Sequence, residues 1–378
     1  MSFFTNRMKS ILEIKNLKGR TALVRVDFNV PLGKDGVVDN TEDWRIEKAL
    51  DTIKHLSKLG SKVILISHIG RDPKESLKPV ADFLNKFIPV KFVPILYGED
   101  VLGIAENLSE GEVIMLENLR SNEGEEKNTE EFSAYLASLA DFYVNEAFSV
   151  SHRPHASIIG VTKFLPSYVG IWFLKEVENL KKLDNPEKPF LFILGGSKFE
   201  TKVPLIEKFS NIADSVFIGG ALANNFMKKI GFETGKSLLD ESVNVTKFFD
   251  KPNIKIPFDV IVRTKEVKTP NGLSKEDMIT DMGPETLDDL KNTIISSKTV
   301  LWNGPLGFYE EGFDTSSKEI LKTISDSKAF SVLGGGDTVK LVKEMGLENK
   351  ISFISTGGGA MLEFLSSGTL VGIEALNK

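Results

Sequence analysis

The 378-residue chain contains no cysteine. This absence excludes a disulfide framework, a thiolate nucleophile and any zinc or iron–sulfur site with cysteine ligands. An excess of positive charge is also missing, because 47 Lys and Arg residues stand against 53 Asp and Glu residues, for a net charge of −6. Non-specific binding of nucleic acid needs a basic surface that displaces phosphate counterions, so no nucleic-acid partner is expected.

Long hydrophobic runs are absent as well. The longest runs, such as residues 63–66 and 190–194, are much shorter than the roughly 20 residues that span a bilayer. Residues 1–9 contain no apolar core of signal-peptide length. We therefore expect no membrane role, no export and a cytoplasmic location.

The overall composition is that of a globular protein, with 41% hydrophobic and 26% charged residues. At roughly 150 residues per domain, the length predicts two domains or at most three. Short apolar runs alternate with stretches of helical periodicity along almost the whole chain, which is the pattern of βαβ units. The fold class predicted is α/β, with two doubly wound, Rossmann-like parallel sheets.

The expected elements of the first half are strands at residues 21–26, 62–66, 113–116 and 142–144 and helices near 45–59, 76–87 and 129–140. The expected strands of the second half lie at residues 190–194, 215–218, 258–262, 299–302, 330–333 and 352–355. Between the halves, residues 166–183 carry apolar side chains at helical spacing and precede Asp184-Asn185-Pro186. This segment predicts a helix that joins the two domains and acts as a hinge.

Glycine-rich turns follow nearly every strand of the second half, with GGSK at 195–198, GG at 219–220, NGP at 303–305, GGGDT at 334–338 and TGGG at 356–359. A backbone without Cβ can approach phosphate oxygens closely and can aim its N–H groups at an anion. Because the carboxyl ends of parallel strands meet at one edge of a sheet, these turns predict a nucleotide or phosphate site. Residues 231–237 imitate a Walker A loop, but only three residues separate their glycines and no strand precedes them, so a surface turn is expected.

Histidines and arginines follow the strands of the first half. His68 and Arg71 follow the second strand, Arg120 follows the third, and the sequence HRPH at 152–155 follows the fourth. Arginine at strand ends suits two-pronged capture of a phosphate or carboxylate, so an anion site is predicted here. His152 and His155 also suggest a metal site, but no third ligand stands at the usual spacing.

Eight motifs together give the chain a close resemblance to the phosphoglycerate kinase family. They are RVDFNVP at 25–31, SHIGR at 67–71, LENLR at 116–120, VNEAF at 144–148, LGGSK at 194–198, WNGPLG at 302–307, GGGDT at 334–338 and STGGGA at 355–360. The motifs occur in the family's order, and the resemblance covers nearly the whole chain.

The resemblance implies three parts. Residues 1–166 form an N-terminal domain that binds 3-phosphoglycerate or 1,3-bisphosphoglycerate, residues 167–184 form the interdomain helix, and residues 185–364 bind ADP or ATP with Mg²⁺. Residues 365–378 return to the first domain. A monomer is expected, and hinge closure would bring the substrates together and exclude water.

The resemblance also implies the site residues. The phosphoglycerate positions are Asp27, Asn29, Arg45, His68, Arg71, Arg120, Arg153 and His155. The nucleotide positions are Gly196, Lys202, Gly219, Gly220, Asn303, Pro305, Glu310, Gly335, Gly336, Asp337 and Thr338, with Glu310 at the ribose and Asp337 at the metal. The catalytic positions are Arg45, Lys198, Gly336 and Gly358, whose charges and backbone N–H groups would stabilise the phosphoryl group in transfer.

The chain departs from the family pattern at a few positions, namely Trp44, Asp72, Pro154 and the pair Ser121-Asn122. None of these departures removes a charged group of the site. Asp72 adds a negative charge beside Arg71, so we expect it to weaken binding of 3-phosphoglycerate.

Three other functions are compatible with parts of the sequence. A nucleotide-binding regulatory protein of the same fold would need neither Lys198 nor Arg45. A Rossmann dehydrogenase is disfavoured because no G-x-G-x-x-G follows a strand. A kinase for another carboxylate, such as acetate, would have no use for the basic cluster.

Overall fold

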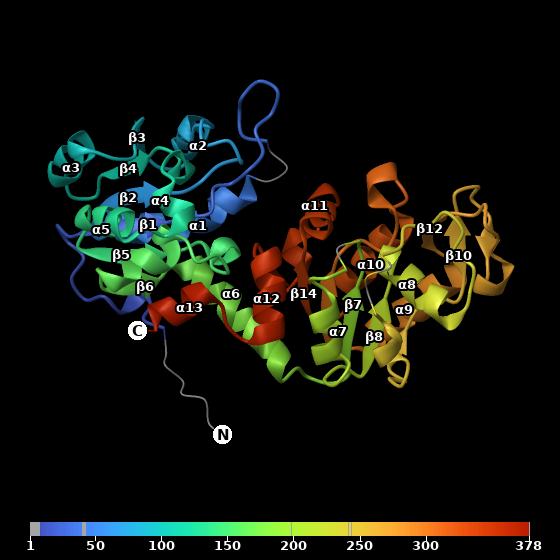
Figure 1. Cartoon of the computed structure of the whole chain (residues 1–378). Helices are drawn as coiled ribbons and strands as arrows, with labels where there is room; N and C mark the ends of the chain where they lie inside the picture. Colours follow the sequence, from blue (N-terminus) through green and yellow to red (C-terminus); the bar gives the residue numbers. More distant parts are fainter. Residues whose placement is uncertain (1–7, 40–42, 198, 241, 243, 378) are drawn as a thin grey trace. The chain divides into compact units, whose positions relative to one another are not determined.

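The computed structural model describes residues 8–39, 43–197, 199–240, 242 and 244–377. The chain divides into two compact units. The first contains the described residues up to Glu178 together with those from Thr369 onward, and the second runs from Asn179 to Gly368 (Figure 1).

A six-stranded parallel sheet forms the centre of the first unit, in the order β3-β4-β2-β1-β5-β6. The strands are β1 (Thr21–Arg25), β2 (Lys62–Ile66), β3 (Lys91–Val93), β4 (Val113–Leu116), β5 (Phe142–Asn145) and β6 (Ser167–Val169). The chain moves outward from β1 on one side and returns to β5 on the other, so the strand order reverses between β1 and β5.

The helices of the first unit are α1 (Trp44–Lys58), α2 (Lys78–Leu84), α3 (Glu99–Glu106), α4 (Gly124–Lys127), α5 (Glu130–Ser138) and α13 (Val371–Leu376). β1, β2, β4 and β5 are almost wholly buried, as parallel strands covered on both faces must be. α13 belongs to this unit although it ends the chain, and the N–H of Gly372 donates to the carbonyl of Ser151 at 2.8 Å.

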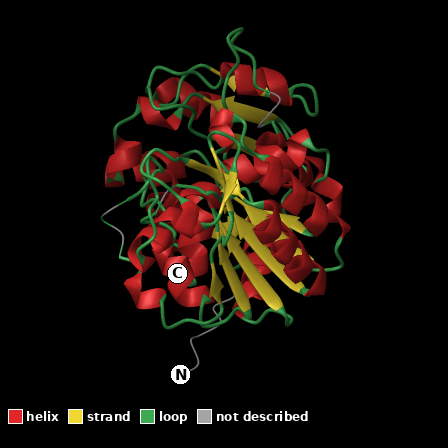
Figure 2. Cartoon of the chain, turned by 90° about the vertical axis from the view of Figure 1, so that its right-hand side faces the viewer, coloured by secondary structure: helices red, strands yellow, loops and turns green. Residues whose placement is uncertain are grey.

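A second six-stranded parallel sheet, in the order β15-β14-β13-β7-β8-β9, forms the centre of the second unit. Its strands are β7 (Phe190–Leu194), β8 (Ser215–Ile218), β9 (Ile254–Lys255), β13 (Thr299–Asn303), β14 (Phe330–Gly334) and β15 (Phe353–Ile354). The helices are α7 (Val203–Phe209), α8 (Gly220–Ile230), α9 (Pro284–Ser296), α10 (Thr315–Asp326), α11 (Gly336–Glu344) and α12 (Gly359–Ser367). Here the strand order reverses between β7 and β13. Figure 2 shows helices packed around the strands.

The predicted fold class of two parallel-sheet α/β domains is confirmed, but one predicted strand belongs to a different sheet. The run at 258–262 is not part of the parallel sheet. Its residues Val260–Val262 form β10, which pairs antiparallel with β11 (Val267–Lys268) and β12 (Ile279–Met282) in a separate three-stranded sheet. A short apolar run of β-branched residues fits a parallel or an antiparallel ladder equally well, and only its partners decide between them.

The predicted joining helix is present as α6 (Ile171–Lys181), followed by a 3-10 turn at Lys182–Asp184. Its predicted start at residue 166 is wrong, because Ser167–Val169 form β6, which pairs with β5. The first turn of α6 is held by the buried carboxylate of Glu146, which accepts hydrogen bonds from the N–H groups of Trp172 and Phe173, both at 2.9 Å. The hydroxyl of Thr52 donates to the same carboxylate at 2.6 Å. Glu146 therefore satisfies two backbone donors that a helix start leaves unpaired.

Candidate active site

Polar side chains of the first unit gather where its strands end. Asp27 follows β1, His68 follows β2, Arg120 follows β4 and Arg153 follows β5. The four strands are neighbours and parallel, so all four residues lie at one edge of the sheet, beside the reversal of strand order. Ligands of open α/β sheets bind at such a point.

Arg45 lies in the first turn of α1 and faces this edge. Its Nη1 atom is 3.9 Å from Oδ2 of Asp27 and donates to the carbonyl of Asn29 at 3.3 Å. Burial alone would raise the pKa of Asp27, but the charge of Arg45 and a hydrogen bond from the hydroxyl of Ser149 bring it below its usual range. Asp27 is thus a carboxylate that helps hold Arg45 in place.

His68 is buried and uncharged. Burial, together with the neighbouring charge of Arg25, lowers the pKa of His68 to about 3. Nη2 of Arg25 lies 3.1 Å from Nδ1 of His68, and a guanidinium can only donate. Nδ1 is therefore the acceptor, and the ring proton is on Nε2, where it can be donated to an anion.

Arg120 ties a neighbouring loop to the same edge. Its guanidinium donates to the carbonyl of Gly70, and its Nε atom is 3.1 Å from Oε1 of Glu126. The N–H of Gly70 donates to the side-chain oxygen of Asn29 at 2.9 Å. Arg71 follows directly, but its side chain is exposed, and among the described residues no ion pair joins it to the cluster.

His155 completes the cluster, with Nδ1 3.7 Å from Oε1 of Glu125. Burial, with the nearby charge of Arg25, lowers the pKa of His155 to about 4, so this ring is also neutral near pH 7. Beneath it, the hydroxyl of Ser157 accepts from Nε of Arg25 at 2.9 Å and donates to Glu125 at 2.6 Å. Sequence reasoning missed Glu125 and Ser157, since one stands within an ordinary acidic run and the other resembles any loop serine.

The second unit contains a pocket of about 600 Å³ at its own reversal of strand order. Part of its lining follows β7, β8, β13 and β14, as Gly196, Gly220, Gly304 and Gly335 do, and another part comes from β10 and β12. The glycine-rich turns that the sequence analysis singled out thus lie around one cavity.

Two of these glycines allow the turns to pack closely. A Cβ on Gly195 would overlap the carbonyl oxygen of Pro305. Gly220 has a φ of +58°, and a Cβ there would stand 2.6 Å from the amide nitrogen of Gly196. Any larger residue would push the turns apart and change the floor of the pocket.

Three helices begin at the wall of this pocket. α8 starts at Gly220, α11 at Gly336 and α12 at Gly359, and all three residues line the cavity. Each helix start presents unpaired N–H groups and a partial positive charge, which favours anions. The convergence of three helix starts predicts binding of a polyanion such as a nucleotide's phosphates.

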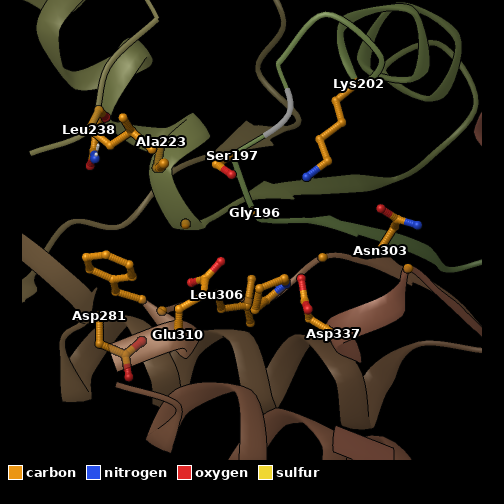
Figure 3. A pocket seen from close by; sticks show the side chains of 18 of the residues that line it. Gly196, Ser197, Lys202, Ala223, Leu238, Asp281, Asn303, Leu306, Glu310 and Asp337 are labelled. Atoms are coloured by element: carbon orange, nitrogen blue, oxygen red, sulfur yellow. Dashed lines mark hydrogen bonds between the residues drawn. The ribbon is translucent and has the colours of Figure 1, made fainter. Parts of the chain in front are cut away.

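Polar side chains gather at one end of the pocket, where Figure 3 shows Lys202, Asn303 and Asp337. Lys202 is 6% exposed and donates to the carbonyl of Gly195. Asn303 is 4% exposed, and its Nδ2 atom has no hydrogen-bond partner among the described residues. A buried donor without a partner, close to the N-termini of these helices, suits a phosphate oxygen.

The other end of the pocket is mostly apolar, with Leu238 and Ala223 on that side in Figure 3. Asp281 lies on the same side, and its carboxylate already accepts from the hydroxyl of Ser316 and the N–H of Met282. Met227 and Val260 also line the cavity. Glu310, in the 3-10 turn Tyr309–Glu311, is exposed at its rim. This division into a polar and an apolar end matches a ligand with phosphates at one end and a flat base at the other.

The structure gathers most of the nucleotide positions that the resemblance implies. Those that line the pocket are Gly196, Lys202, Gly220, Asn303, Pro305, Glu310, Gly335, Gly336 and Asp337, and the catalytic position Gly358 lines it as well. Gly219 precedes the first residue of α8, and the buried hydroxyl of Thr338 accepts from the N–H of Gly304 at 3.0 Å, so both support the wall. Lys198 lies outside the described residues.

No group of three or more His, Asp or Glu residues suited to a metal occurs among the described residues. The pair His152 and His155 therefore forms no such group with a third residue. Asp337 is a single carboxylate at the first turn of α11, beside the polar end of the pocket. Magnesium commonly takes one or two protein carboxylates and completes its shell with phosphates and water, so these residues fit Mg²⁺ that arrives with a nucleotide.

No helix in the described part of the chain is long and apolar enough to cross a membrane.

The segment that imitates a Walker A loop begins at Gly231, whose φ of +106° ends α8, and the described residues up to Asp240 form no helix after it. This geometry is a helix C-cap, as the interpretation of a turn requires.

The chain is similar to known proteins over nearly its whole length. The family model described as phosphoglycerate kinase matches residues 11–368. The phosphoglycerate kinase of Dictyoglomus turgidum is 41% identical over 97% of this chain and 98% of its own length, and that of Leptospira biflexa is 42% identical over 97% and 98%.

Solved structures agree with these sequence matches. Phosphoglycerate kinase from Coxiella burnetii superposes with a TM-score of 0.84 at 31% identity, covering 98% of this chain and 99% of the other. Phosphoglycerate kinase from Pyrococcus horikoshii OT3 gives a TM-score of 0.85 at 29% identity, covering 98% of each chain. Together with the family model, these matches show that the chain belongs to the phosphoglycerate kinase family.

Proposed function

We propose that the chain transfers a phosphoryl group reversibly between 1,3-bisphosphoglycerate and ADP, giving 3-phosphoglycerate and ATP. The observation that carries this proposal is the presence of two complementary sites in one chain. The first unit has a cluster of arginines and neutral histidines around Asp27, and the second has a pocket entered by three helix N-termini. The first suits a small phosphorylated carboxylate, and the second suits a nucleotide.

In this proposal the phosphoglycerate is held by Asp27, Asn29, Arg45, His68, Arg71, Arg120, Arg153 and His155. The arginines supply paired donors for the phosphate and carboxylate, as a planar guanidinium does well. His68 contributes a hydrogen bond without charge, because its pKa is far below 7. The exposed side chain of Arg71 has room to turn toward the ligand.

The nucleotide would occupy the pocket with its phosphates at the polar end, near Lys202 and Asn303. The unpartnered Nδ2 of Asn303 supports this orientation. Glu310 at the rim would accept hydrogen bonds from the ribose hydroxyls. Asp337 would hold Mg²⁺, which when bound neutralises charge on the nucleotide's phosphates.

The transfer step needs no general base. A carboxyl group has a pKa near ~3.5–4, so the carboxylate of 3-phosphoglycerate is ionised at pH 7 and can attack directly. A bond forms between its oxygen and the γ-phosphorus of ATP, the bond from that phosphorus to the bridging oxygen breaks, and ADP leaves with the electron pair. Arg45, Lys198 and the backbone N–H groups at Gly336 and Gly358 would stabilise the charge on the transferred group.

The two ligands must meet for this step. We propose that a hinge movement of the chain brings them together and excludes water that would otherwise hydrolyse the acyl phosphate. The chain would act as a monomer, since the movement is internal to one chain. Its proposed location is the cytoplasm.

Turnover tests the proposal directly. ATP, Mg²⁺ and 3-phosphoglycerate are supplied, and the 1,3-bisphosphoglycerate formed is drawn off by a coupled reduction that consumes NADH. Consumption that depends on 3-phosphoglycerate is expected. Tight ADP binding without turnover would favour a regulatory protein, and equal turnover with acetate would favour a general carboxylate kinase.

Asp72→Ala is expected to lower the KM for 3-phosphoglycerate about two- to threefold with little change in kcat, as expected for loss of one exposed like charge beside an anion site. The carboxylate of Asp72 accepts the N–H of Lys74 at 2.9 Å, which fixes its charge on the loop of Arg71. Asp72→Asn keeps the capping geometry without the charge and should give the same change. A KM that is unchanged or higher in both variants would contradict the prediction.

A further inference from the structure

One face of α8 forms part of the pocket wall. Gly220, Ala223, Asn224 and Met227 line the cavity, and their spacing of three and four residues places them along one side of the helix. Three of these residues are glycine or apolar, as a wall for a flat base requires. Asn224 is the exception.

The side-chain amide of Asn224 is buried, with 3% of the residue exposed. Its Nδ2 atom donates to the carbonyl of Leu238 at 3.1 Å, and Leu238 also lines the pocket. Because a backbone carbonyl only accepts, this bond fixes which end of the amide is nitrogen. The oxygen, Oδ1, is then left without a hydrogen-bond partner among the described residues.

The adjacent residue, Asn225, shows that the unpaired amide oxygen is specific to Asn224. Asn225 is similarly buried, at 5% exposed, but does not line the pocket. Its Nδ2 donates to the carbonyl of Asp240 at 2.5 Å, and its Oδ1 accepts the N–H of Asp240 at 3.2 Å. Asn225 therefore supports the fold with a complete pair of bonds, whereas Asn224 keeps one acceptor open at a ligand pocket.

An open acceptor on the otherwise apolar α8 face of the wall favours a ligand that brings a donor. Buried polar groups are nearly always paired, so the acceptor is satisfied when such a ligand enters and stays unsatisfied when the ligand has an oxygen at that point. The neighbouring residues Leu238 and Met227 are apolar and suit the face of a base, while phosphates suit the opposite end. Among purines, the exocyclic group at C6 is an amine in adenine and a carbonyl oxygen in guanine and hypoxanthine.

We propose that Oδ1 of Asn224 accepts a hydrogen bond from the exocyclic amine of the base, so that this chain selects 6-aminopurine nucleotides over 6-oxopurine nucleotides. The inference rests on the proposed nucleotide pocket and names its base specificity. Asn224 is a specificity residue here, since it touches the base and not the reacting phosphates.

The test is calorimetric binding of three diphosphates to the full chain: ADP, IDP and purine riboside 5′-diphosphate, which has only hydrogen at C6. Wild type should bind ADP at least about tenfold more tightly than either analogue, in the range expected for one buried hydrogen bond. Asn224→Leu removes the acceptor while keeping an apolar wall. In this variant the preference for ADP over either analogue, taken as the ratio of dissociation constants, should fall below about threefold. Asn225→Leu is the matched control and should retain the wild-type ratio.

Each protein is judged by its preference for ADP over the analogues. A variant that is damaged and binds all three diphosphates more weakly therefore keeps this preference and does not imitate the loss of the Asn224 acceptor. The wild-type comparison of ADP with purine riboside 5′-diphosphate needs no variant, and equal affinities would overturn the proposal. An unchanged ratio in Asn224→Leu, or an equal loss in Asn225→Leu, would also overturn it. These measurements are independent of turnover, so selective ADP binding without phosphoglycerate kinase activity would uphold the inference and refute the proposed reaction.

Discussion

Arg45→Met is expected to lower kcat for the transfer to 3-phosphoglycerate by about 10²–10³-fold, as loss of one preorganised charge on a developing anion does. Arg45 is held toward the site by Asp27, with 3.9 Å between Nη1 and Oδ2, and by the carbonyl of Asn29. Its side chain is only 22% exposed, so its charge is less screened than that of a surface arginine. The coupled NADH assay at saturating ATP and Mg²⁺ measures the effect.

Lys58→Met is the matched control, because it removes one positive charge from the exposed end of the same helix and should leave kcat unchanged. Lys198→Ala should resemble Arg45→Met, with a fall in kcat of orders of magnitude. Affinity of Arg45→Met for ADP should equal that of wild type, since the nucleotide pocket is lined by residues of the second unit alone. Normal turnover in Arg45→Met would remove Arg45 from the catalytic group.

The long buried strands could be predicted from sequence because each is a continuous apolar run between polar turns. β2, β4, β7 and β8 begin and end where the runs do. The edge strands β3, β6 and β9 were not predicted. They contain three, three and two residues, and their backbone hydrogen bonds to a neighbouring strand define them more than any pattern of side chains does.

The candidate sites were predictable to the extent that they follow from strand ends. Parallel strands bring their carboxyl ends to one edge, so His68, Arg120 and Gly220 could be assigned to sites from their positions after strands. Asn224 could not be recognised in this way, because its open acceptor depends on where the carbonyl of Leu238 lies. Glu125 likewise gives no local signal that it is buried.

Glu125 belongs to a buried polar network beneath the basic cluster. Arg25 and Glu125 are each 1% exposed, and the hydroxyl of Ser157 lies between them. Burial raises the pKa of Glu125, although Arg25 and Ser157 act against this, and burial lowers the pKa of Arg25. Both changes show charges taken out of water, which is costly for either charge alone.

Glu125→Leu is therefore expected to lower the free energy of unfolding of the first unit by about 3–5 kcal/mol, because it removes the strongest negative charge acting on the buried Arg25. Arg25→Met should lower the free energy of unfolding by a similar amount, because it leaves the buried carboxylate of Glu125 without the positive charge of Arg25. The double variant removes both charges, so its loss should be smaller than the sum of the single losses by about 2–3 kcal/mol. Hydrogen exchange of β1 and β5 as a function of urea concentration reports on this unit.

Two comparisons separate a charge network from simple packing. Glu123→Gln, on an exposed residue paired with Lys127 just before α4, should leave unfolding unchanged. Strict additivity in the double variant would mean that Arg25 and Glu125 act independently, and the network would be refuted. Non-additivity would instead show that Arg25 and Glu125 stabilise the fold together. Since Arg25 also donates to His68, the orientation of that ring in the basic cluster would then depend on the carboxylate of Glu125.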